Sequence, residues 1–79
     1  MASEQEIREE NRRLRWVRTI VDLTMAVLQQ ESMSLTEALA LTRAVKQSVL
    51  RLFPDKEATY DLIYKPRFER VIRERLGQN

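Results

Sequence analysis

Hydrophobic and polar positions along this chain recur with the period of about 3.6 residues that is typical of α-helices. The pattern forms three segments, over residues 3–31, over residues 35–53 and from Pro54 to the C-terminus, with Pro66 inside the third. One Gly and two Pro are too few for the frequent reversals of a small β-domain. We therefore predict an all-α fold, a three-helix antiparallel bundle with a long first helix and a Pro-bent third helix, or a fourth short helix where the bend separates its pieces.

The segment over residues 3–31 predicts one long helix. Ser3 is placed to cap it, and the acidic residues that follow suit the positive end of the helix dipole. From Leu14 onward the polar residues narrow to a strip, and the apolar arc is wider than one neighbouring helix can cover. We expect this half of the helix to be the central member of the fold, with these apolar residues: Trp16, Val17, Ile20, Val21, Leu23, Val27 and Leu28.

The second helix has the clearest boundaries. Ser34 and Glu37 form a capping-box pattern, in which each side chain accepts a hydrogen bond from the other residue's amide. Pro54 disfavours a helical conformation at the residue before it, so the helix should end near Phe53. Its predicted buried face consists of Leu35, Ala38, Leu39, Thr42, Val45, Val49, Leu52 and Phe53.

The third helix is predicted in two pieces. Asp55 is placed to cap a first piece over residues 56–64. Pro66 then lacks an amide hydrogen, and its ring clashes with the carbonyl four residues earlier, so the chain should bend before a second piece over residues 66–76. Gly77 is a natural stop. The second piece presents one apolar face: Phe68, Val71, Ile72 and Leu76.

The predicted helix lengths are unequal, and this matters for function. The chain of 79 residues is one domain. At about 1.5 Å per residue the first helix is about 43 Å long and the second about 28 Å, so about 15 Å of the first helix overhangs. Residues 1–13 therefore protrude or fray, and from residue 3 to about residue 13 they carry one large apolar side chain, Ile7. This overhang either frays in solution or lies against another chain.

Composition argues against catalysis. Cys and His, the usual nucleophile and neutral-pH base, are both absent, which also removes disulfides and most zinc sites. Asp55, Glu57 and Asp61 could bind a divalent cation, but a cap and an exposed helix face explain them. We predict no enzyme activity, no cofactor and no metal. With no apolar run of about 20 residues and no secretory pattern, we expect a cytoplasmic protein without a membrane partner.

A core this small rarely supplies more than about 3–5 kcal/mol, so self-association is expected. Ile7, Leu14, Val21 and Leu28 repeat every seven residues, but the matching second positions of the heptad are mostly polar, which argues against a full coiled coil. We predict a short helix-to-helix dimer contact through Ile7, Leu14, Val17 and Val21.

Arginine is clustered over residues 12–18 and 65–75. Parallel first and third helices could merge the two clusters into one face, and Trp16 could stack on a nucleic-acid base. The candidate contacts are Arg12, Arg13, Arg15, Trp16, Arg18, Arg67, Arg70 and Arg73. The alternative is solvated helix faces, with pairing of Arg8 to Glu4, Arg13 to Glu9, Arg18 to Asp22 and Arg70 to Glu74. A helix-turn-helix is rejected, because the helix over residues 56–64 carries more acidic than basic residues.

Aromatic residues gather around the predicted bend. Tyr60, Tyr64 and Phe68 share one helix face at spacings of four residues, which usually means core. The alternative is a groove for a protein partner, lined by these three residues with Arg67 as its charged anchor.

The sequence thus favours a small helical interaction or assembly module, such as a regulator, adaptor or small subunit. It would self-associate through its first helix, as a dimer, or bind another protein. The alternative function is nucleic-acid binding through the two arginine clusters.

Overall fold

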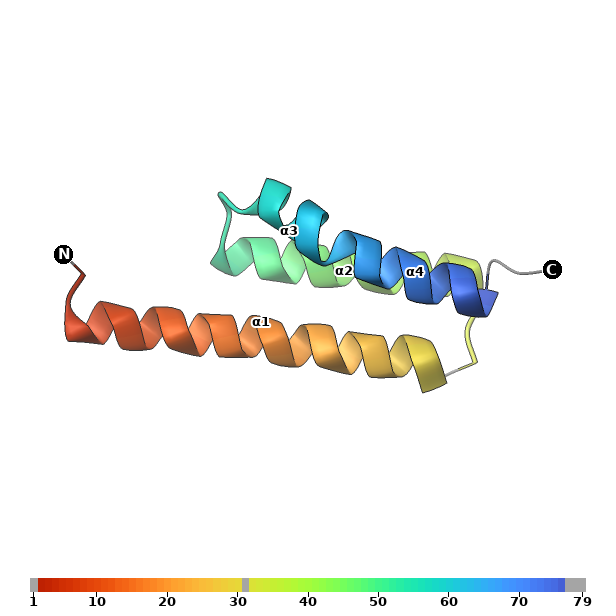
Figure 1. The fold of residues 1–79 in the computed structure, drawn as a ribbon, viewed down its shortest axis with the longest axis horizontal. Coiled ribbons are helices and arrows are strands. Elements are labelled where there is room, and N and C mark those ends of the chain that lie inside the picture. The colour runs from red at the N-terminus through yellow and green to blue at the C-terminus, as the bar shows by residue number, and fades with distance from the viewer. Residues whose placement is uncertain (1, 31, 77–79) are drawn as a thin grey trace.

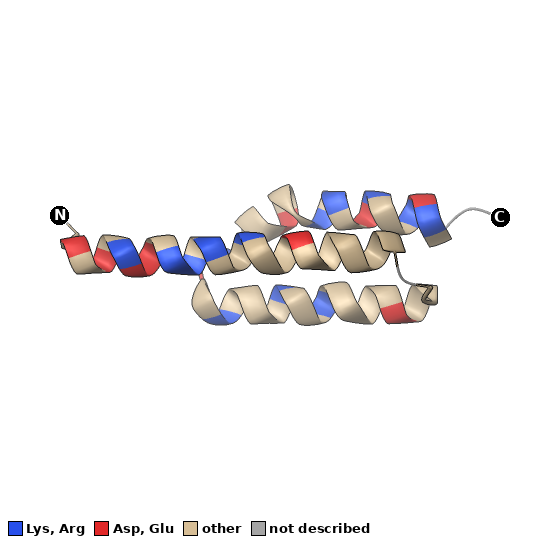
Figure 2. Ribbon diagram, turned by 90° about the horizontal axis from the view of Figure 1, so that it is seen from below, with Lys and Arg blue, Asp and Glu red and all other residues tan. Residues whose placement is uncertain are grey.

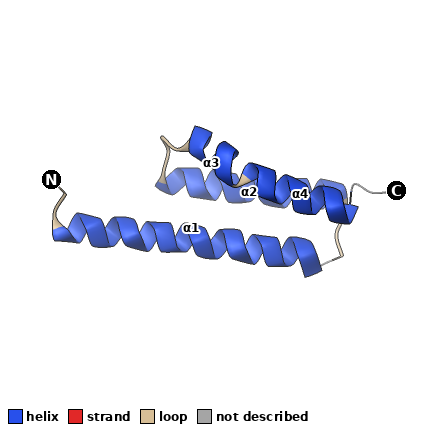
Figure 3. Ribbon diagram, viewed as in Figure 1, coloured by secondary structure: helices blue, strands red, loops and turns tan. Residues whose placement is uncertain are grey.

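The computed structural model describes residues 2–30 and 32–76, and the described part of the chain is helical without strands (Figure 3). Four helices follow one another: α1 (Glu4–Gln30), α2 (Leu35–Leu52), α3 (Glu57–Ile63) and α4 (Lys65–Leu76). The all-α prediction is confirmed. The count of three helices is not, because the predicted bent third helix is two separate helices.

The helices form an elongated antiparallel bundle (Figure 1). α2 runs back along α1, and α3 and α4 then follow each other in the direction of α1. α1 packs against both α2 and α4, and α2 also contacts α4. The Cα radius of gyration is 14.4 Å. A compact domain of this length has about 12 Å. The excess reflects the end of α1, which projects past the other helices in Figure 1.

Side-chain caps fix where the first two helices begin. The Ser3 hydroxyl accepts a hydrogen bond from the Glu6 amide at 3.1 Å. At α2, the Ser34 hydroxyl accepts from the Glu37 amide at 3.1 Å, and the Glu37 carboxylate accepts from the Ser34 amide at 2.9 Å. These bonds to Ser34 lower the pKa of Glu37. Both caps confirm the sequence prediction.

The turn between α2 and α3 differs from the prediction. The Lys56 amide donates to the Phe53 carbonyl at 3.1 Å, which closes a turn around Pro54 and Asp55. Helix α3 therefore starts one residue later than expected, with Lys56 as its N-cap and no capping side-chain hydrogen bond. The prediction that Asp55 caps this helix is wrong.

The break between α3 and α4 falls at Tyr64, close to the predicted bend. The Tyr64 amide still donates to the Tyr60 carbonyl, so α3 ends with a regular helical bond. Pro66 has no amide hydrogen with which to continue the pattern. The Arg67 and Phe68 amides both donate to the Tyr64 carbonyl at 3.1 Å, which starts the ladder of α4. The predicted stop at Gly77 and the last predicted residue of the first helix lie outside the described residues.

The core is a strip of medium-sized side chains along the axis of the bundle. Every helix contributes, and its members are Val17, Val21, Thr24, Leu28, Ala38, Val45, Val49, Tyr60, Phe68, Val71 and Ile72. Thr24 is accommodated because its hydroxyl donates to the Ile20 carbonyl at 2.6 Å.

The predicted buried faces were too wide. Leu35 and Leu39 are exposed, because the buried side of α2 centres on Ala38, Val45 and Val49 and leaves them at its edge beside α4. On α1, Trp16 and Leu23 are exposed although the helix packs against two others. The fold therefore leaves a considerable apolar surface uncovered.

Candidate functional site

An apolar groove lies between the N-terminal half of α1 and helix α3, and it encloses about 280 Å³. We call it the end groove, because it lies at the end of the bundle beyond which α1 protrudes. Its lining residues are Glu10, Leu14, Val17, Val49, Phe53, Lys56, Thr59, Tyr60, Ile63 and Tyr64. Leu14 and Ile63 are each nearly half exposed. Glu10 and Lys56 place one charge of each sign in the lining.

The apolar stripe of α1 continues past the end of the bundle. Ile7, Leu14, Val21 and Leu28 recur every seven residues, which places them on one face of the helix. Val21 and Leu28 are 2% exposed, whereas Ile7 is 51% and Leu14 47% exposed. The same face is thus core along one half of α1 and open surface along the other, and the end groove begins where the covering helices stop.

Helix α3 is held in place by a lysine from α2. The Lys46 ammonium lies 2.9 Å from the Glu57 carboxylate and 2.9 Å from that of Asp61, and so bridges one turn of α3. Hydrogen bonds to Glu57 and then Asp61 raise the pKa of Lys46. This contact orients α3 so that Thr59 and Ile63 line the end groove.

Tyr60 is the aromatic anchor of α3. It is 4% exposed, and its ring lies 5.6 Å from the ring of Tyr64, centroid to centroid, at a tilt of 51°. Among the described residues its hydroxyl finds no hydrogen-bond partner. Burial raises the pKa of Tyr60 to about 12. The side chain acts as core and also lines the end groove.

Only two of the four residues of the predicted dimer contact are accessible in the structure. Ile7 and Leu14 are accessible, but Val17 and Val21 are 4% and 2% exposed and pack inside the chain's own core. They cannot contact a partner without opening the bundle, so the interface prediction is corrected for these two residues. The seven-residue repeat alone does not reveal which part of the stripe the chain itself covers.

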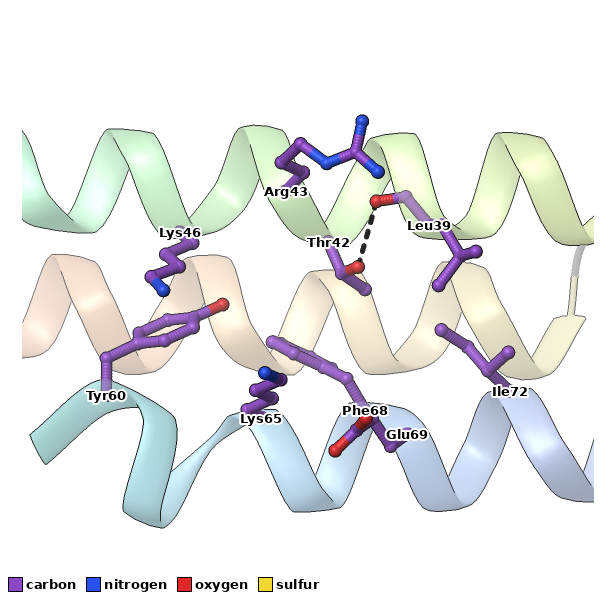
Figure 4. Close-up of a pocket in the computed structure, with 9 residues that line it drawn as sticks. All are labelled: Leu39, Thr42, Arg43, Lys46, Tyr60, Lys65, Phe68, Glu69 and Ile72. Carbon is purple, nitrogen blue, oxygen red and sulfur yellow. Dashed lines mark hydrogen bonds between the residues drawn. The ribbon is translucent and has the colours of Figure 1, made fainter. Parts of the chain in front are cut away.

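The four residues predicted to line one partner groove do not line a common groove in the structure. Tyr60 and Phe68 line a cavity of about 310 Å³ between α2 and α4, where they reach toward Thr42 and Lys46 of α2 (Figure 4). Tyr64 instead lines the end groove on the side of α1, and Arg67 is exposed and lines neither. Tyr60 and Phe68 belong to the core, which is the more usual role of such an aromatic row.

The arginine residues do not form one continuous face. Arg12, Arg13 and Trp16 of α1 meet Arg51 of α2 around a hollow of about 390 Å³, which Ser48 and Leu52 complete. We call it the arginine hollow. The remaining candidates are exposed elsewhere: Arg15, Arg18, Arg67, Arg70 and Arg73. In Figure 2 the basic stretches of α1 and α4 follow each other along the bundle and do not lie side by side. The two clusters are therefore separate surfaces.

Two of the four ion pairs expected at a spacing of four residues occur between described residues. Arg8 pairs with Glu4 at 2.8 Å, and Arg13 lies 3.9 Å from Glu9. The expected pairs of Arg18 with Asp22 and of Arg70 with Glu74 are not among the ion pairs of the described part. The absence of these two pairs weakens the interpretation of the arginines as paired, solvated helix faces.

Several site residues were not predicted from the sequence. Phe53 and Ile63 line the end groove, and Arg51 joins the arginine hollow. A further apolar stripe of α1 has the heptad spacing of four, three and four residues. Its members are half-buried or exposed: Trp16, Ile20, Leu23 and Val27. That spacing is visible in the sequence and could have been used to predict a second apolar face on α1.

Within residues 2–30 and 32–76, no three His, Cys, Asp or Glu side chains gather closely enough to hold a metal ion. None of the described helices combines the length and apolar character needed to cross a membrane. Comparison of the chain with protein-family models, curated proteins and solved structures gives no significant match. The functional argument therefore depends on the surfaces of this chain alone.

Proposed function

We propose that this chain is a helical assembly module that self-associates through the exposed face of the N-terminal half of α1. The observation that carries the proposal is the exposure of Ile7 and Leu14 on the face of α1 that forms the core farther along. A partner that covers this face would extend the core beyond the end of the bundle. The end groove, with Ile63 half exposed beside Leu14, enlarges the apolar surface on offer.

The expected assembly is weak. A contact limited to a few helical turns buries less than the roughly 1,600 Å² of a standard protein interface. Burying a half-exposed Ile side chain contributes about 1 kcal/mol, which in a symmetric dimer counts twice. Ile7→Glu should therefore weaken the dimer by at least about thirtyfold, since about 1.4 kcal/mol corresponds to a factor of ten.

Sedimentation equilibrium from 10 µM to 1 mM tests this proposal. Wild type should dimerise in that range, and Ile7→Glu and Leu14→Glu should remain monomeric with unchanged far-UV circular dichroism. Gln5→Glu is the matched control, because it adds the same charge on the opposite face of the exposed segment. A wild-type monomer at every concentration would refute the proposal, as would an Ile7→Glu variant that dimerises like wild type.

The second candidate function is binding of single-stranded nucleic acid, which the arginine hollow favours. Three arginines line this hollow together with Trp16, which is 42% exposed. Phosphates would pair with the arginines, and a base would stack on Trp16. Binding of a labelled oligonucleotide at 20 mM salt, weakening steeply toward 200 mM, would support this function. Equal binding by the Trp16→Ala, Arg51→Ala double variant would refute it.

A further inference from the structure

The charges on the N-terminal half of α1 are sorted along the helix. Residues 4–10 carry four glutamates against one arginine, and residues 12–18 carry four arginines and no acid. All of these charged side chains are exposed. Figure 2 shows the acidic stretch at the N-terminal tip of α1, followed by the basic stretch toward the bundle. The segment that presents Ile7 and Leu14 is thus negatively charged at its N-terminal end and positively charged toward the bundle.

We propose that the partner on this segment is a second copy of the chain whose α1 runs antiparallel, so that Ile7 of each copy contacts Leu14 of the other. This inference rests on the self-association proposed above and adds its geometry. The two-fold axis then passes between Glu10 and Asn11. A parallel pairing would set glutamates against glutamates and arginines against arginines, which disfavours it.

The charges also match on each flank of the apolar stripe. At about 100° per residue, Glu6 and Arg13 lie on one flank, and Glu4 and Arg18 on the other. In the antiparallel pair, Glu6 comes within side-chain reach of Arg13 of the second copy. Glu4 likewise comes within reach of Arg18. The acidic tip of each α1 also approaches Lys56, which lines the end groove of the other copy.

An unrelated partner would need its own charge pattern to match this segment, whereas a second copy supplies it by symmetry. A two-fold contact uses the same patch on both copies, so the dimer leaves no such patch free for a third copy. The expected product is a dimer and not a filament.

The absence of Cys from the sequence makes the geometry testable by disulfide trapping. Single-cysteine variants Ile7→Cys and Leu14→Cys of the full chain are oxidised separately and as an equimolar mixture. A disulfide needs Cα atoms within about 7 Å. In the antiparallel pair, two cysteines introduced at position 7 are about 10 Å apart along the axis, whereas a cysteine at position 7 faces one at position 14 of the other copy. The mixture should therefore form the mixed disulfide at least tenfold faster than either variant alone forms its own.

Matched controls and the remaining outcomes separate the two proposals. Gln5→Cys and Arg12→Cys have the same seven-residue spacing on the opposite face, and their mixture should cross-link only at the slow rate of random collision. Rapid cross-linking of Ile7→Cys alone and Leu14→Cys alone would overturn the antiparallel geometry and keep the self-association. A dimer of wild type in which neither the mixture nor the single variants cross-link would overturn the pairing of these two residues. Monomers throughout would overturn the proposed function as well.

Discussion

The buried hydroxyl of Tyr60 makes this fold sensitive to alkali in a way that one substitution should abolish. The side chain is 4% exposed, its hydroxyl has no partner among the described residues, and burial raises its pKa from 10.0 to about 12. Above pH 10 the unfolded chain gives up this proton while the folded chain keeps it. Stability is therefore complete below pH 10 and falls as the pH rises from 10 toward 12.

The size of the effect follows from the two pKa values. At pH 11 the difference in proton binding lowers the free energy of unfolding by about 1 kcal/mol, and the limit above pH 12 is about 3 kcal/mol. These losses are large for a domain whose core supplies about 3–5 kcal/mol. Tyr60→Phe keeps the ring, removes the ionisable group and leaves no new unpaired polar atom. At pH 7 it should be neutral or slightly stabilising, because an unpartnered buried hydroxyl contributes nothing favourable.

The assay is urea unfolding followed by far-UV circular dichroism at pH 7, 9, 10 and 11, for wild type, Tyr60→Phe and Tyr64→Phe. Lys46 also contributes to alkaline unfolding, because its pKa in the folded chain is raised above the ordinary 10.5. This stabilisation is complete below pH 10.5 and is lost as the pH rises above it. That contribution is common to all three proteins, so the difference between wild type and Tyr60→Phe isolates the hydroxyl. Equal losses for wild type and Tyr60→Phe between pH 9 and pH 11 would refute the reasoning.

Two further predictions concern the core and the helix cap. The Phe68 ring is 2% exposed. Phe68→Ala should lower the free energy of unfolding by about 3–5 kcal/mol, which is enough to unfold most of the protein. Thermal denaturation measures this loss. Leu62 is 78% exposed, and Leu62→Ala should change stability by no more than about 0.5 kcal/mol. Comparable losses for both variants would contradict the assigned core. Ser34→Ala removes the hydroxyl that accepts from the Glu37 amide. It should cost about 1 kcal/mol in urea unfolding, with Ser32→Ala as the control. A Ser34→Ala variant as stable as the control would show that the capping box does not stabilise α2.

Local signals in the sequence predicted the parts of the fold that local chemistry determines. The Ser34–Glu37 capping box and the Ser3 cap occur as expected, because a cap depends on residues only three positions apart. An interruption near Pro66 was expected for the same reason, since a missing amide hydrogen acts within one turn, but it separates two helices and does not bend a single one. The predicted cap at Asp55 was wrong because the turn closes through backbone groups of Phe53 and Lys56.

Burial was harder to predict, because it depends on which neighbour lies on which side of a helix. Periodicity places Val21 and Ile7 on the same face of α1, but only the extent of the other helices decides that one is core and the other surface. The same limitation applies to Leu39, which lies at the edge of the face that α2 buries. Phe53 and Ile63 were not predicted in the end groove for a related reason, since they come together with α1 only through the packing of α3.

The shortness of α3 has a consequence for the motion of this molecule. A helix of seven residues is far below the length at which an isolated helix persists in water. Helix α3 therefore exists only through its tertiary anchors, the lysine bridge from α2 and the ring of Tyr60. It should open and close as a small cooperative unit while α1 and α2 stay intact, and its amides should exchange with solvent well before those around Val45. Each opening removes one wall of the end groove. The surface offered at that end of the bundle would then be set by a local folding equilibrium, which a bound partner would shift toward the closed form.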